Sequence, residues 1–205
     1  DYLSQSCLGM LAATPEDAWT VASVIAQRVG GDPGFAPLHG PLMPPPARAP
    51  RRLALLQTSG WDKASPGAKA ALDAARKKLA GLGVDVVDRS ADPDLEALEH
   101  AIRDVVPLTF SICDYEQLWP RGTYAKHEGM AEATRRRLAA AQTMTTDDYR
   151  EALWRRHEIR QRYAWASARY DAVVTLGATG AAPVGLSWTG DPSFNVPASL
   201  LGTPA

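Results

Sequence analysis

The segment from Asp171 to Ala205 limits the fold more than any other part of the chain. It begins as a strand, because Val173 and Val174 are β-branched and Gly177 is a typical strand-end residue. No periodic pattern continues beyond that point, and closely spaced glycines and prolines exclude a long helix. These residues are Gly177, Gly180, Gly185, Gly190 and Gly202, with Pro183, Pro192, Pro197 and Pro204. We therefore expect a buried strand followed by an irregular, well-packed loop.

This loop is rich in neutral hydrogen-bonding side chains. They are Thr175, Thr179, Ser187, Thr189, Ser193, Asn195, Ser199 and Thr203. A long loop at the end of a buried strand is a common place for a binding site, because a rigid sheet then positions backbone amides and hydroxyls. An ordinary surface connection is the alternative that composition leaves open.

The overall composition excludes several classes of function. The chain has 205 residues, with 22 basic and 23 acidic side chains and 45% apolar residues. This balance lacks the basic excess of a nucleic-acid-binding domain, and no apolar run approaches the roughly 20 residues of a membrane span. Cys7, Cys113 and the four histidines lack metal-site spacing, so we expect no metal and no cofactor. We interpret the cysteines as reduced thiols of a cytoplasmic protein.

The first 50 residues contain one clear helix signal and one linker signal. Thr14 is a good N-cap and Pro15 suits the first helical position, so a helix is predicted up to Val29. The range 35–50 is rich in proline, which favours an extended surface linker or strap. A ligand for a proline-recognition domain is the functional alternative.

A β-α-β unit follows the linker. Residues 53–56 form a short apolar strand, and Ser65 with Pro66 begins a helix. Residues 84–87 then give a second strand. Parallel strands joined by a right-handed crossover are the default for such a unit.

Residues 92–143 are predicted to be largely helical. A helix beginning at Asp92 or Asp94 should be bent or broken by Pro107, and the range 120–122 reads as a turn. The range 130–141 predicts another helix, with consecutive arginines at 135–137. Three consecutive residues spread around a helix, so these arginines cannot all face one ligand, and a solvated face is expected.

The longest helix is predicted from Asp147 to Tyr170. Thr145 or Thr146 caps it, and apolar residues recur at three-to-four spacing along one side. Trp154, Tyr163 and Trp165 are more often core or cover residues than parts of a ligand box. This helix leads directly into the strand at Asp171.

Two stretches of the chain resemble the amidase signature family. The run YDAVVTLGATGAAP followed by TGDPSFNVPASLLGTPA is similar to the end region of that family, with matches at Asn195, Pro197, Gly202, Pro204 and Ala205. The range 1–34 is similar to the piece that follows the family's catalytic loop. The positions Ser6, Cys7 and Met10 depart there from the usual aspartate, threonine and proline.

The resemblance implies an α/β fold with a mixed, largely parallel β-sheet core covered by helices on both sides. It also implies that residues 1–205 are a single α/β domain, as a fragment of a longer amidase domain. Members of the family hydrolyse amides with a serine, a second serine in a cis peptide, and a lysine. The resemblance places those residues upstream of Asp1, so no catalytic residue is assigned to this chain.

The chain is then expected to supply part of a pocket wall for a small-molecule amide substrate. The candidate binding residues are Asn195, Thr179, Trp188 and Ser193, followed by Ser6 and Cys7. An amide side chain at Asn195 can both donate to and accept from a carboxamide. For each of these residues, a loop-stabilising role is the alternative.

Three functions remain open at this point. The first is an amidase, the second is the glutamine-hydrolysing subunit of a tRNA-dependent amidotransferase, and the third is a non-catalytic scaffold member of the family. No nucleic acid or membrane contact is expected of this segment, and a homodimer is left open as its assembly.

Overall fold

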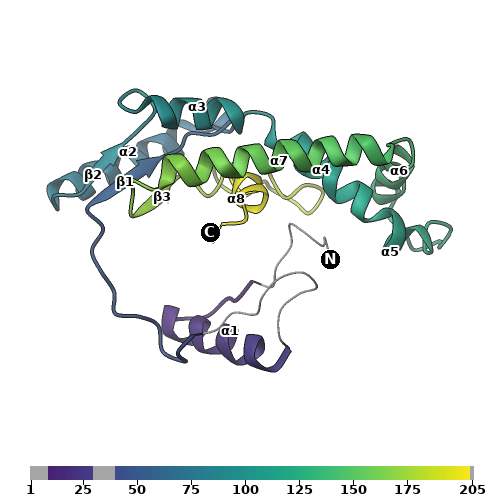
Figure 1. The fold of residues 1–205 in the computed structure, drawn as a ribbon, viewed down its shortest axis with the longest axis horizontal. Helices are drawn as coiled ribbons and strands as arrows, with labels where there is room; N and C mark the ends of the chain where they lie inside the picture. The colour runs from purple at the N-terminus through teal and green to yellow at the C-terminus, as the bar shows by residue number, and fades with distance from the viewer. Residues whose placement is uncertain (1–8, 30–39, 204–205) are drawn as a thin grey trace. The chain divides into compact units, whose positions relative to one another are not determined.

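The computed structural model describes residues 9–29 and 40–203, and the chain divides into two compact units between Ala49 and Pro50. Figure 1 shows the helices and strands along the chain. The first unit contains helix α1 (Pro15–Val29), and the second contains all the other elements. The single domain expected over residues 1–205 stays a prediction.

The second unit alternates strands with helices. In chain order its elements are β1 (Arg52–Leu55), the 3₁₀ helix η1 (Trp61–Lys63), α2 (Pro66–Gly81), β2 (Asp85–Val87), α3 (Pro93–Ala101), α4 (Val105–Glu116), α5 (Leu118–Gly122), α6 (Glu132–Ala141), α7 (Thr146–Ser167), β3 (Ala172–Val174) and α8 (Val196–Leu201). No helix among the residues described is both long and apolar enough to cross a membrane.

In the first unit, α1 begins where the sequence predicts. The Thr14 hydroxyl accepts a hydrogen bond from the Asp17 amide at 3.1 Å, which caps the helix. Residues 40–50 form no helix or strand and are mostly exposed. The Trp19 indole donates to the Pro41 carbonyl at 2.9 Å, which attaches this stretch to α1. The rest of the predicted linker, residues 35–39, lies outside the described residues.

The three strands form one parallel sheet in the order β2-β1-β3. The connection from β1 to β2 and the connection from β2 to β3 run in opposite directions along this sheet. Right-handed crossovers therefore place α2 on one face and the helices from α3 to α7 on the other. This arrangement confirms the predicted α/β class with helices on both sides of a largely parallel sheet.

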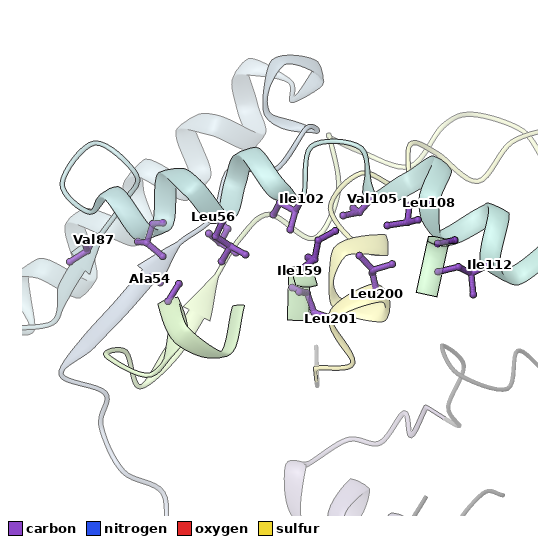
Figure 2. Close-up of a cluster of buried hydrophobic side chains, with 14 residues drawn as sticks. Ala54, Leu56, Val87, Ile102, Val105, Leu108, Ile112, Ile159, Leu200 and Leu201 are labelled. Carbon is purple, nitrogen blue, oxygen red and sulfur yellow. The ribbon is translucent and has the colours of Figure 1, made fainter. Parts of the chain in front are cut away.

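The core lies on the face covered by α3 and α7. Ala54 and Leu56 point to this face because side chains alternate along a strand. Figure 2 shows the buried cluster continuing from this sheet face through Ile102 and Ile159 to Leu200 on α8. Leu53 and Leu55, on the opposite face, are also buried, so β1 is covered on both sides as a central parallel strand should be.

The longest helix, α7, is anchored at its start and along one side. The Thr145 hydroxyl accepts from the Asp148 amide, and the Asp148 carboxylate accepts from the Thr145 amide at 2.7 Å, which completes a capping box. Ile159 and Ala166 are buried in the core. The helix runs from the α6 end of this unit to the sheet end (Figure 1).

Three local predictions are corrected by the structure. Pro107 does not break a helix; it lies in the first turn of α4, where a missing amide hydrogen costs nothing. Pro120 likewise lies inside the short helix α5 rather than in a turn. Trp154 and Trp165 are exposed rather than part of the core, whereas Tyr163 is partly buried against the core as predicted.

The consecutive arginines of α6 diverge, but two of them are bonded rather than simply solvated. The Arg135 guanidinium donates to backbone carbonyls of the preceding loop, including Met130 at 3.2 Å. Arg137 pairs with Asp114 of α4. Only Arg136, paired with Glu132 on the same helix at 3.0 Å, lies on a solvated face as predicted.

Candidate functional site

The loops that follow β1 and β3 begin at the same edge of the sheet. The two strands are parallel neighbours, so their carboxyl ends meet there. The connection that leaves β1 runs toward β2 and away from β3. The strand connections therefore diverge at this edge, between β1 and β3. In open parallel α/β sheets, ligands bind outside the carboxyl ends of the strands at such a point. Residues 57–65 and 175–195 therefore form the candidate site.

The loop after β1 is strained and firmly held. Thr58 has a φ of 55°, a left-handed conformation that is unusual for a β-branched residue. The preceding amide, that of Gln57, donates to the buried Glu99 carboxylate at 2.7 Å. Arg89 contacts the other oxygen of Glu99 at 3.2 Å. Burial nonetheless raises the pKa of Glu99, because desolvation outweighs these two partners.

The loop after β3 is attached to the loop after β1 at three points. The Ser65 amide donates to the Thr179 carbonyl at 2.7 Å. The Lys63 ammonium donates to the Asp191 carboxylate at 2.8 Å. In addition, the Phe194 ring packs directly against Gly60, where a Cβ would lie only 2.7 Å from the ring carbon Cε2. The two ends of the second loop are thus fixed to one short segment, Gly60–Ser65.

Asp191 organises the second of these attachments. Its other carboxylate oxygen accepts from both the amide, at 2.9 Å, and the hydroxyl of Ser193. The hydrogen bonds from Lys63 and Ser193 lower the pKa of Asp191 to about 2. This carboxylate is therefore ionised throughout the physiological pH range and holds the loop in one conformation.

Between these attachments the loop extends an apolar tip, which we define as residues 183–188. Val184 and Leu186 are fully exposed, and Trp188 is 60% exposed. Gly185 and Gly190 have φ values of 95° and 108°, a region that a glycine adopts without strain. Two of the glycines predicted from the sequence to interrupt regular structure thus adopt left-handed conformations within and just after this tip.

The predicted binding residues are distributed over both parts of the loop. Thr179 and Ser193 lie at the attachments, and the Ser193 side chain is buried with its hydroxyl bonded to Asp191. Trp188 lies on the exposed tip. Asn195 is exposed at the start of α8, and its side chain makes no capping hydrogen bond. Ser6 and Cys7 lie outside the described residues.

Two cavities of the second unit lie elsewhere. One of 510 Å³ is formed by the α5–α6 region around Tyr124 and Met130. Another of 310 Å³ lies between the α3–α4 turn and α7. Neither is lined by Thr179, Trp188, Ser193 or Asn195. The candidate site is therefore distinct from these two cavities.

The residues described here do not form an activated nucleophile at this site. The Ser193 hydroxyl donates to Asp191, whose pKa of about 2 makes it a poor general base. Lys63 donates to the same carboxylate. Cys113 is a buried thiol whose pKa is raised to about 11, chiefly by burial, so it is not an exposed thiolate. The described residues contain no cluster of three metal-ligating side chains either.

Sequence reasoning missed Gly60, Lys63 and Asp191, which hold the site together. The sequence Asp191-Pro192-Ser193 has the composition of a turn in which an aspartate accepts from the residue two positions later, so this bond could have been anticipated. The pairing of Lys63 with Asp191 could not, because 128 positions separate them in sequence.

Comparisons with known proteins agree with this architecture. A solved crystal structure of an amidase is similar to the chain, with a TM-score of 0.55 and 20% sequence identity. The match covers 78% of this chain and 38% of that amidase, so the chain spans well under half of its length. No match is found among curated proteins. At this identity the structural match establishes the fold alone.

A comparison with protein families covers more of the chain than the structural match does. The family model described as Amidase matches residues 2–193. That range includes the loop after β1, the apolar tip, Asp191 and Ser193. The match extends over nearly all of the sequence, and the chain belongs to the amidase family.

Proposed function

We propose that this chain is part of an amide hydrolase that cleaves a carboxamide C–N bond to give a carboxylate and ammonia or an amine. The observation that carries this proposal is the family match over residues 2–193. The architecture supports it, because the candidate loop projects from the edge where parallel α/β sheets bind their ligands.

The bond-breaking residues of the proposed reaction are expected upstream of this chain, as the family resemblance implies. Amide hydrolysis needs a nucleophile with a partner that accepts its proton, and donors that stabilise the oxyanion. Ser193, Lys63 and Cys113 do not meet the first requirement, for the reasons given above. Following the family resemblance, we assign the nucleophilic serine, the second serine in a cis peptide and the lysine to a part of the protein that precedes this chain.

The role proposed for the present chain is to shape the substrate side of the site. Asn195 is exposed and its amide makes no capping bond, so it can donate to and accept from a carboxamide. Trp188 offers an apolar surface to the rest of the substrate. Thr179 and Ser193 hold the loop in position, with Ser6 and Cys7 as further candidates. A cytoplasmic location and a homodimeric assembly stay predictions.

Ammonia release from a panel of carboxamides tests the proposal. In the longest gene product that contains this chain, Asn195→Ala should raise KM or lower kcat several-fold. Ser199→Ala, an exposed change on the same helix, is the matched control and should leave both constants unchanged. A fluorophosphonate that modifies active serines should abolish the activity. Absence of both ammonia release and serine modification would instead identify a non-catalytic scaffold.

A further inference from the structure

The cavity between the α3–α4 turn and α7 is lined mainly by charged side chains. It has a volume of 310 Å³. The end of α3 contributes His100, and the α3–α4 turn contributes Arg103 and Asp104. Helix α7 contributes Arg155, Glu158 and Arg162. The α7 residues are spaced three and four apart, so they lie along one side of the helix and face the same cavity.

The floor of this cavity is rigid. Ile159 lies on α7 between Glu158 and Arg162 in sequence and is 4% exposed, while Ile102 in the turn is fully buried. Both belong to the continuous core shown in Figure 2. The charged side chains therefore extend from a backbone framework that is fixed by packing.

Positive charge exceeds negative charge in the cavity, with three arginines against Asp104 and Glu158. Within the described part of the chain, the guanidinium groups of Arg103 and Arg162 make no hydrogen bond or ion pair. Arg155 contacts Asp104 only at 3.8 Å. The partly negative C-terminal end of α3 and the partly positive N-terminal end of α4 meet here and offset each other. The charged side chains therefore determine the sign of the local electrostatic potential.

We infer that this cavity binds a compact oxyanion carrying at least two negative charges, with Arg103 and Arg162 as its principal ligands. The planar guanidinium group donates two parallel hydrogen bonds to a carboxylate or phosphate, which suits it to this ligand class. Arg155 contributes a third positive charge from the side, and His100 adds a further donor. Glu158 opposes the anion and limits its affinity.

Titration calorimetry of the whole chain with pyrophosphate, at low ionic strength, tests this inference. Arg103→Gln and Arg162→Gln should each weaken binding about tenfold, because each removes charge-assisted hydrogen bonds. Glu158→Gln should strengthen binding severalfold, a gain that a misfolded variant cannot produce. The matched control is Arg136→Gln, which removes an equal charge from the solvated face of α6 and should leave the affinity unchanged.

Citrate in place of pyrophosphate distinguishes a polycarboxylate ligand from a phosphate ligand, and binding of either one supports the inference. Sodium chloride at matched ionic strength should produce no saturable heat. The inference is overturned if neither anion binds, if Arg136→Gln weakens binding as much as Arg162→Gln, or if Glu158→Gln has no effect.

Discussion

Replacing Gly60 with alanine should destabilise the second unit by about 1–3 kcal/mol, the usual cost of overpacking a close-packed site. Gly60 has φ and ψ of −78° and −15°, which any residue adopts, so alanine would cause no backbone strain at this position. The added Cβ would lie 2.7 and 2.9 Å from two Phe194 ring carbons and 3.0 Å from the Ser193 Cβ. Carbon atoms normally approach to about 3.5–4.0 Å.

The surroundings of Gly60 cannot easily absorb this methyl group. Phe194 and Ser193 are only 4% and 3% exposed, and Asp191 fixes the Ser193 backbone. The ring must therefore shift against its other neighbours, or the attachment between the two loops must open. Phe194→Leu should relieve part of the clash, so the double variant should lose less stability than the sum of the two single losses.

Urea titration followed by far-UV circular dichroism and tryptophan fluorescence measures these effects. The matched control is Gly67→Ala in the first turn of α2, where a Cβ would meet nothing within 4 Å. There, alanine should leave stability unchanged or raise it by up to about 1 kcal/mol. If Gly60→Ala proved as stable as the unmodified chain, Phe194 could not be packed on Gly60 as described.

Two further changes test the attachments around the sheet. Asp191→Asn should cost on the order of 1 kcal/mol at pH 7, because Lys63 is largely exposed and its ion pair is partly screened. The depressed pKa of Asp191 stabilises the fold above pH 4, so this contribution should disappear as pH falls from about 4 toward 2 in the unmodified chain but not in Asp191→Asn. Equal acid sensitivity of both proteins in urea titrations would contradict this assignment. Thr145→Ala removes the hydroxyl of the α7 capping box and should lower the unfolding free energy by about 1 kcal/mol, whereas Thr143→Ala, just before the cap, should have a smaller effect.

Helix starts could be predicted from the sequence because their chemistry is local. Thr14, Ser65 and Thr145 each accept a hydrogen bond from an amide three residues later, as their sequence positions indicate. The effect of Pro107 on its helix could not be predicted from neighbouring residues in the same way. A proline is tolerated in a first turn and disruptive in the middle of a helix, so its effect depends on where the helix begins.

The parallel pairing of β1 with β2 also followed from the sequence, because two strands joined through a helix are parallel by default. The exposure of large side chains, in contrast, could not be predicted from the sequence. Trp154 and Trp165 fall outside the seven-residue spacing of the buried positions Ala152, Ile159 and Ala166, and they are exposed. Their size and apolar character alone therefore did not indicate burial.

For the candidate site, the sequence located the loop but not its construction. Its position followed from the apolar strand at 172–174 and the glycines and prolines beyond it. The attachments to Gly60, Lys63 and Ser65 join positions more than one hundred residues apart, and a single sequence contains no signal for such pairings. Which predicted residues meet the substrate stays a prediction.

The shortness of the outer strands has a consequence for the behaviour of this chain in solution. In the described part of the chain, β2 and β3 form the two borders of the sheet, and each is three residues long. Unpaired backbone groups along a sheet border can recruit a strand from another molecule and so start aggregation. Borders this short present few such groups, which protects the chain from edge-to-edge association.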